Sequence, residues 1–143
     1  MANVIYRGPV EREAETLNLP VTGAYLPGTF VTKASTGSVV TATAGTGRLL
    51  LLSNPRFLER DIDTAYTAGE TGIQYRIEPE QEYYACAVIG NYADQTELTV
   101  NATGVLAAAV AGDAVVAFVD GAINLVAAGF MDVVIASRYI KAL

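Results

Sequence analysis

The sequence predicts an all-β protein, a single-domain β-sandwich or β-barrel of short antiparallel strands with an extended N-terminal arm. Two observations carry this prediction. Short apolar or alternating runs recur at intervals of roughly ten residues, and Gly, Pro, Asn and Asp turn signals separate them. We count about nine such runs, a number typical of a sandwich or barrel. A chain of 143 residues has the size of one domain.

The first segment, residues 1–20, is predicted to be an extended arm, and residues 21–143 the β domain. Pro9 and Pro20 lack a backbone donor and fix φ, which suits an extended arm better than a central strand. A frayed terminus is the alternative. An apolar cluster favours an ordered arm that lies on a partner. The arm residues expected at this interface are Val4, Ile5, Tyr6, Arg7, Pro9 and Arg12.

In the first half of the domain, each predicted strand follows a turn signal. Pro27-Gly28 precedes a strand that begins at Thr29, and residues 35–38 precede a strand over 39–43. The run 48–53 is short and almost continuously apolar, as expected of a strand that is buried on both faces.

In the middle of the chain, residues 73–77 alternate between apolar and polar side chains. This alternation places Ile73, Tyr75 and Ile77 on one face of a strand. Two further strands are predicted over 83–89 and 98–100.

The last third is Ala-rich and more ambiguous. Residues 105–110 are compatible with one helical turn or a strand. Residues 114–119 are predicted to form a strand that ends in a tight turn, and residues 131–137 form the final strand. The remaining residues, 138–143, are predicted to be a tail.

The charge balance argues against nucleic-acid binding. The net charge is −6, and the nine Lys and Arg residues are scattered instead of clustered. Charged residues make up only 17% of the chain, which suggests that partners cover part of the surface. No run of about 18 uninterrupted apolar residues predicts a membrane span, and the start of the chain does not resemble a signal peptide.

The residue types argue against an enzyme, a metal site or a cofactor site. The chain has no His, the commonest general base and metal ligand, and its one Cys, Cys86, lies in an apolar run that predicts burial. Carboxylates at 61 and 63, and at 78, 80 and 82, are interpreted as solvated turns.

A second candidate contact follows the buried run 48–53. Arg56, Phe57 and Arg60 place an aromatic ring between two cations, a combination typical of interface anchors. A loop that packs on its own domain is the equal alternative.

The layout of these phrases resembles the small decoration (cement) proteins of tailed-phage capsids, over residues 8–137. The phrases are Leu26-Pro27-Gly28-Thr29-Phe30-Val31, Arg48-Leu49-Leu50-Leu51-Leu52-Ser53-Asn54-Pro55, Asp63-Thr64-Ala65-Tyr66-Thr67-Ala68-Gly69-Glu70-Thr71, and Ala111-Gly112-Asp113 with the strand that follows.

The resemblance implies a structural virion protein, assembled in the host cytoplasm, that binds the outer capsid surface. It would stabilise the shell by bridging major capsid protein subunits. It would act as a homo-oligomer, a homotrimer in preference to a homodimer, without direct contact to nucleic acid or membrane. The alternative function is a β-structured phage tail, spike or adhesion subunit that binds host glycans through its eight tyrosines.

Overall fold

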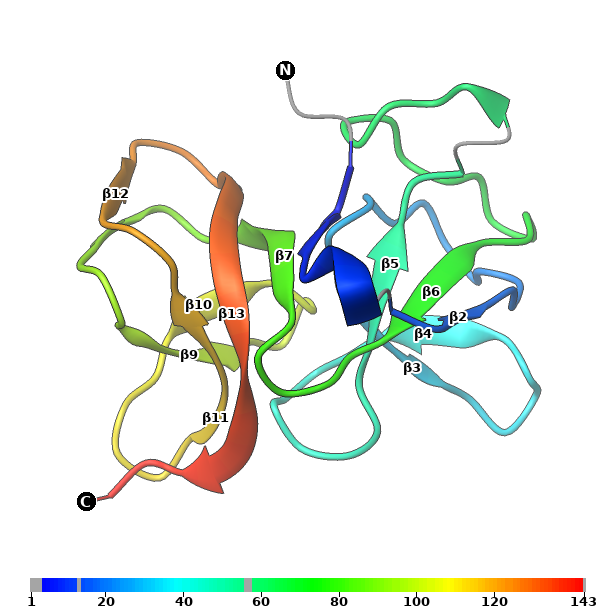
Figure 1. Cartoon of the computed structure of the whole chain (residues 1–143). Helices are drawn as coiled ribbons and strands as arrows, with labels where there is room; N and C mark the ends of the chain where they lie inside the picture. Colours follow the sequence, from blue (N-terminus) through cyan, green and yellow to red (C-terminus); the bar gives the residue numbers. More distant parts are fainter. Residues whose placement is uncertain (1–3, 13, 56–57, 143) are drawn as a thin grey trace.

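The computed structural model describes residues 4–12, 14–55 and 58–142, and strands dominate it (Figure 1). This confirms the predicted all-β class. The elements, in chain order, are β1 (Tyr6–Gly8), the 3-10 turn η1 (Val10–Arg12), β2 (Thr16–Leu17), β3 (Phe30–Lys33), β4 (Val39–Thr41), β5 (Leu50–Ser53), β6 (Ile73–Arg76), β7 (Glu82–Ala87), β8 (Gly90–Tyr92), β9 (Glu97–Val100), β10 (Leu106–Ala108), β11 (Ala114–Val119), β12 (Ile123–Leu125) and β13 (Gly129–Ile140).

The C-terminal half of the chain closes into a small barrel. Its strands follow the order β7-β10-β9-β11-β13, and β13 pairs back with β7 to complete the ring. All neighbours are antiparallel except β7 and β10, which are parallel. The short β8–β12 pair lies at one end of this half (Figure 1). Closure leaves few strand edges that could pair with other chains.

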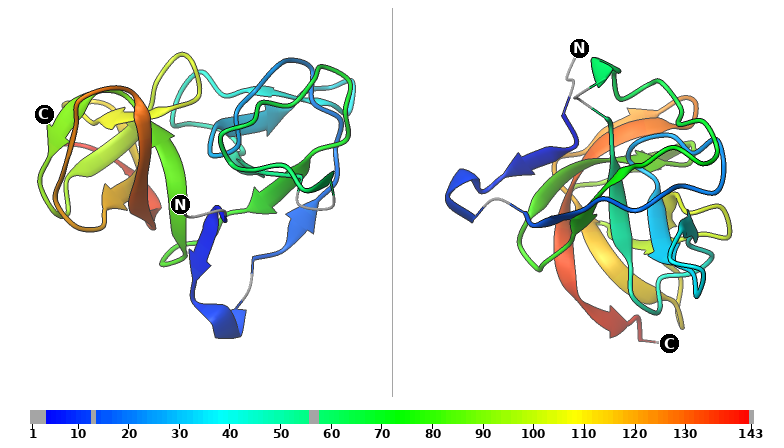
Figure 2. Two further views of the ribbon diagram at one scale, coloured as in Figure 1. Left: turned by 90° about the horizontal axis from the view of Figure 1, so that it is seen from above. Right: turned by 90° about the vertical axis from the view of Figure 1, so that its right-hand side faces the viewer.

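The N-terminal half forms an open five-stranded sheet, in the order β2-β6-β5-β3-β4, beside the barrel (Figure 2). All four residues of β5 are buried, as the continuous apolar run predicted. The alternation prediction for 73–77 is only partly correct, because Gln74 and Tyr75 are both buried. Gln74 faces residue 19, where its side-chain amide donates to the Leu19 carbonyl at 3.0 Å and accepts from the Leu19 N–H at 2.9 Å.

The N-terminal segment packs on its own chain. Strand β1 pairs with β7, and β2 pairs with β6, so the segment joins both halves. Ile5 is fully buried in the main core, and the Tyr84 N–H donates to its carbonyl at 2.7 Å. Between β1 and β2 the chain projects from the body around η1 (Figure 2). Part of the segment therefore belongs to the hydrophobic core.

The two halves share one hydrophobic core. Its largest cluster contains Phe30 and Leu51 from the sheet together with Leu98 and Val133 from the barrel. Rings of Tyr6, Tyr75 and Tyr83 meet where β1, β6 and β7 converge, with centroid separations of 5.3 to 5.9 Å.

Backbone hydrogen bonds also cross the junction between the halves. The Cys86 N–H donates to the Gly28 carbonyl at 2.9 Å, and the Phe30 N–H donates to the Gly104 carbonyl at 2.8 Å. Gly28 has φ of 85°, and a Cβ built on it would lie 2.7 Å from Cε1 of Phe130 and 3.2 Å from the Cys86 nitrogen. Only glycine allows this backbone to approach the barrel so closely.

In the last third, the structure decides between two open alternatives and corrects one prediction. Residues 106–108 form strand β10, which resolves the ambiguity of the Ala-rich run. The predicted tail is wrong in part, because β13 continues to Ile140 through pairing of Tyr139 with Val115 and Ile140 with Ala114. Tertiary pairing with β11 decides the state of this weakly patterned segment. Among the described residues, no helix is long and apolar enough to cross a membrane.

We predict that Gly28→Ala lowers the free energy of unfolding by about 1–3 kcal/mol more than Gly37→Ala does. Both glycines have positive φ, but a Cβ at Gly37 meets nothing within 4 Å. The pair therefore separates the contact with Phe130 and Cys86 from the cost of the backbone conformation. Urea unfolding of the two variants measures the difference. Equal losses would show that the junction tolerates a methyl group.

Candidate interaction surface

The arm residues predicted at an interface occupy unlike environments. Val4 is exposed at the start of the described chain, whereas Ile5 is fully buried and therefore unavailable to a partner in this conformation. Tyr6 is half-buried, and its hydroxyl donates to the Pro9 carbonyl at 2.5 Å. Pro9 is also half-buried. Ile5 lies just before β1, and its side chain belongs to the main hydrophobic core.

Arg7 is the arm residue with the most polar surroundings. Its Nε lies 3.4 Å from Oδ1 of Asp132, and its guanidinium lies 4.5 Å from the centre of the Tyr84 ring. Tyr84 in turn stacks on Phe130 with a centroid separation of 5.2 Å. Arg7 thus fastens β1 to the outer face of β7 and β13. Arg12 lies in η1, and its side chain is outside the described part of the structure.

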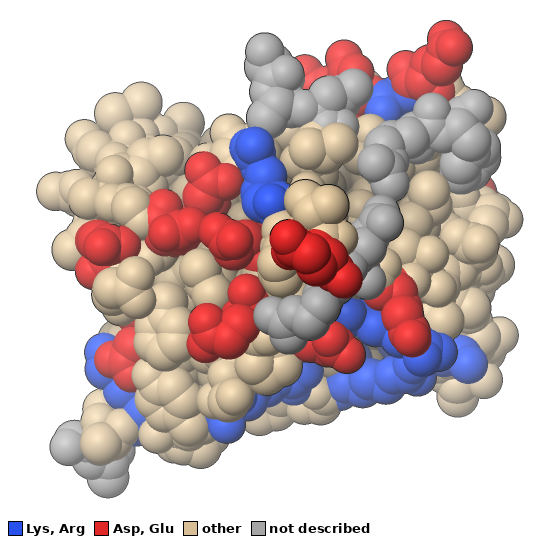
Figure 3. All heavy atoms as spheres, viewed as in Figure 1, with Lys and Arg blue, Asp and Glu red and all other residues tan. Residues whose placement is uncertain are grey.

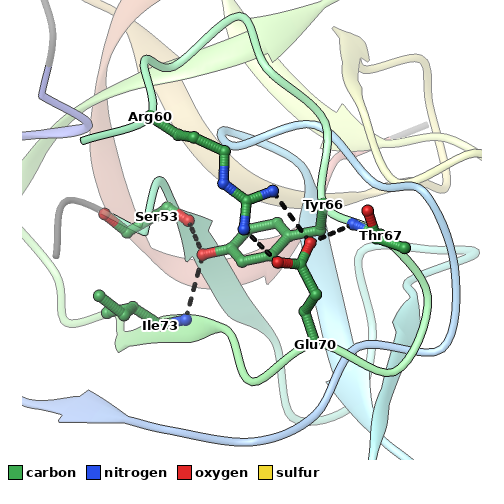
Figure 4. A network of polar contacts seen from close by, with 6 residues as sticks. All are labelled: Ser53, Arg60, Tyr66, Thr67, Glu70 and Ile73. Carbon is green, nitrogen blue, oxygen red and sulfur yellow. Dashed lines mark hydrogen bonds and ion pairs between the residues drawn. The ribbon is translucent and has the colours of Figure 1, made fainter. Parts of the chain in front are cut away.

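The second predicted contact falls partly outside the described residues. Arg56 and Phe57 are among the residues that the structure does not describe, so their role stays a prediction. Arg60 is described and packs on its own domain. It forms a two-armed ion pair with Glu70, and its guanidinium lies 5.9 Å from the centre of the Tyr66 ring (Figure 4).

This network holds the long connection between β5 and β6. The buried Tyr66 hydroxyl donates to the Ser53 carbonyl at 2.5 Å and accepts from the Ile73 N–H at 3.2 Å, which joins the two strand ends (Figure 4). Burial raises the pKa of Tyr66 to about 12. Hydrogen bonds from Arg60 and from the Thr67 N–H lower the pKa of Glu70 to about 2. The arrangement favours a fixed loop conformation, with Arg60 as its internal brace.

The carboxylates interpreted as turns do not converge on a site. Asp61 and Asp63 are exposed in the β5–β6 connection, and Glu78 and Glu80 are exposed in the turn before β7. Glu82 is half-buried, and its pKa is raised by burial and by its neighbours Asp120 and Asp132. Within the described parts of the chain, no group of three or more His, Cys, Asp or Glu is placed to hold a metal ion.

The tyrosines serve the core more than the surface. Only Tyr139 is exposed, and the other seven are buried or half-buried. Cys86 is buried, as predicted, and burial raises the pKa of its thiol to about 12.

The clearest candidate for a contact surface is apolar and lies where the barrel meets the sheet. A hollow of about 210 Å³ opens there, lined mainly by apolar side chains that include Leu26, Val105 and Phe130. Leu26 is 41% exposed at its rim. Ile89 (63% exposed) lies between Ala87 and Gly90 in the chain, and Val126 (82% exposed) lies between Leu125 and Gly129. Because Gly90 pairs with Leu125 and Ala87 pairs with Gly129, Ile89 and Val126 lie close to the same rim. We call Leu26, Ile89, Val126 and this hollow the apolar patch.

Turn signals in the sequence did not predict the apolar patch. The strand predicted over 83–89 ends at Ala87, which leaves Ile89 in the connection to β8, and Val126 follows β12 beside Ala127 and Ala128. A large β-branched residue in a loop can indicate a contact surface, because loops usually carry polar or small residues. Clustered exposed apolar side chains are typical of interaction sites, whereas single ones are ordinary.

No protein-family model matches this chain, and no curated protein matches its sequence significantly.

We predict that Glu70→Gln removes an acid-sensitive part of the stability. The folded-state pKa of Glu70 is about 2, below its ordinary value of about 4.3 in an unfolded chain. The ion pair therefore stabilises the fold fully above the unfolded pKa, and this contribution is lost as the pH falls from about 4.5 to 2. The wild type should lose more stability over this interval than the variant, measured by urea unfolding at several pH values.

Asp61→Asn is the matched control, because Asp61 is exposed in the same connection and makes no ion pair within the described structure. It should retain the wild-type pH dependence. A Glu70→Gln profile parallel to that of the wild type would contradict the stabilising role of the ion pair.

Proposed function

We propose that this protein decorates the outer surface of an assembled phage capsid and stabilises the shell by bridging major capsid protein subunits. It acts as a homo-oligomer, a trimer in preference to a dimer, and it contacts protein surfaces without binding nucleic acid or membrane. The proposal combines the resemblance in sequence layout with the surface features of this all-β fold.

The observation that carries the proposal is the apolar patch. Leu26, Ile89 and Val126 leave large apolar surfaces in solvent around a ready-formed hollow. Covering them with another protein removes apolar area from water, which favours binding by about 25 cal/mol for each Å². The hollow accepts an apolar side chain of the partner, as interface pockets commonly do.

Bridging a shell does not require strong individual contacts. An oligomer presents each contact surface several times, so that its binding to a regular lattice is multivalent. Symmetric closure of the oligomer also covers some of the exposed apolar surface. Acidic net charge keeps the free protein soluble until it meets the lattice.

We predict selective, saturable co-sedimentation of the purified protein with expanded capsids of candidate tailed phages. Unexpanded proheads should bind it weakly, because expansion rearranges the joints that a bridging protein recognises. Gel quantification of the pellet gives the copy number per capsid. Failure to bind any shell would overturn the proposal, and binding on a glycan array would then favour the tail or adhesion alternative.

We predict that Ile89→Asp with Val126→Asp weakens capsid binding at least tenfold, because the patch would then bury two carboxylates without partners. Both side chains are exposed, so the fold should be retained, which circular dichroism checks. Thr36→Asp with Ala68→Asp adds the same charge at exposed positions and should bind normally. Equal binding by both double variants would remove the apolar patch from the interface.

A further inference from the structure

Three basic side chains of this acidic protein gather at one edge. Lys33 ends β3, and Arg48 lies opposite it, since Val31 pairs with Leu50 and Thr32 Oγ1 donates to the Arg48 carbonyl at 3.1 Å. Arg138 of β13 reaches the same loop and donates to the Gly47 carbonyl. We call Lys33, Arg48 and Arg138 the basic edge. Figure 3 shows basic side chains along the lower edge of the molecule and acidic ones above them.

The other basic side chains that the structure describes all form ion pairs. Arg7, Arg60, Arg76 and Lys141 each lie within 4 Å of a carboxylate oxygen, at distances of up to 3.4 Å. Of the basic side chains in the described part of the chain, only those of the basic edge have no carboxylate partner. In a chain with net charge −6, three adjacent uncompensated cations form a local surface that attracts anionic groups.

An open strand lies beside the basic edge. Strand β13 pairs with β7 only as far as Val134, and Ile135 makes the last backbone contacts on that side, with Glu80 and Gln81. Beyond this point β13 pairs with β11 alone. Backbone groups of Lys141 bond toward β11, to Gly112 and Asp113, so those of Ile140 point to the opposite edge. No described strand pairs there.

The surface between the strand and the basic edge is hollowed. A cavity of about 270 Å³ is lined by Gly45, Thr46 and Gly47, by Ala114 of β11 and by the end of β13. A Cβ added at Gly47 would meet nothing within 4 Å, so the surface is open at this end of the loop. Ile140 (61% exposed) and Tyr139 (40% exposed) supply apolar contact area.

We propose that the basic edge and the open end of β13 form a docking site for an extended, carboxylate-rich segment of a partner protein, which adds a strand to β13. The partner's backbone pairs with the edge, while its carboxylates meet Lys33, Arg48 and Arg138. Strand addition of this kind gives affinity through main-chain hydrogen bonds and specificity through side chains. The identity of the partner rests on the proposed function, in which the segment belongs to the capsid subunit.

A nucleic acid fits this site less well. Three cations are few beside the roughly six to ten phosphate contacts of typical DNA-binding proteins, and the net charge of −6 opposes a polyanion. A phosphate backbone also has no N–H and C=O groups to pair with a strand edge. A protein segment satisfies both the charges and the edge.

The test compares two double variants. One carries Lys33→Gln and Arg48→Gln, and the other carries Ala68→Glu and Ala122→Glu. Each double variant lowers the net charge by two at exposed positions, but only the first removes cations from the basic edge. Arg138 is kept, because it holds the Gly47 loop. Two protein probes are used at low and high salt, poly-L-glutamate on beads and expanded capsids, and double-stranded DNA on beads serves as the comparison. Hydrogen exchange measures protection of residues 137–140.

The wild type and the Ala68/Ala122 variant should bind poly-L-glutamate and gain protection at the Ile140 amide. The Lys33/Arg48 variant should bind roughly tenfold more weakly. The same ranking is expected with capsids. Any one of three results would overturn the inference. These are equal binding of both double variants to the two probes, stronger retention of the wild type on double-stranded DNA than on poly-L-glutamate, and binding without protection at 137–140. If no shell binds the wild type but poly-L-glutamate ranks the variants as expected, the decoration function fails and the docking site stands.

Discussion

The structure depends on the close approach of two backbones where the open sheet meets the barrel. At Gly28 an added Cβ would lie 2.7 Å from the Phe130 ring, and the Gly28 carbonyl accepts a hydrogen bond from the Cys86 N–H. A second glycine, Gly104, lies in the barrel half, and its carbonyl accepts a hydrogen bond from the Phe30 N–H. A Cβ added at Gly104 would lie 2.6 Å from the Phe30 carbonyl oxygen. Because these bonds join β3 and the residues before it to the barrel directly, the two halves cannot shift relative to one another without losing paired buried backbone groups.

Aromatic packing extends this junction to the N-terminal segment. Tyr6, Tyr75 and Tyr83 come from three different strands, and each ring contacts the other two. Aromatic pairs at such separations contribute beyond their buried area. With Ile5 buried in the same core and Gln74 bonded to Leu19, the segment before residue 20 is part of the fold from both ends. The turn around η1 projects from the body (Figure 2).

Local patterns predicted the all-β class and several strands, because those signals depend on neighbouring residues. The run 48–53 is the clearest case: its continuous hydrophobicity matches a strand buried on both faces. Other features depend on partners far along the chain. The pairing of β1 with β7 joins residues more than seventy positions apart, and the extension of β13 to Ile140 depends on β11. Arg60 looked like an interface anchor, because nothing in its neighbourhood revealed that Glu70 would fold back onto it. The exposure of Ile89 and Val126 also follows from topology, which leaves the end of the β8–β12 pair uncovered.

The positions of the two candidate contact surfaces follow from the same junction. The apolar patch combines Leu26 from the connection before β3 with Ile89 and Val126 from the barrel half. The basic edge combines Lys33 and Arg48 from the sheet half with Arg138 from the barrel half. Each surface therefore exists only when the two halves are correctly joined. The junction therefore sets the position of each surface on the molecule. Two contacts held at a fixed separation lose less conformational entropy on binding than two contacts on a flexible linker.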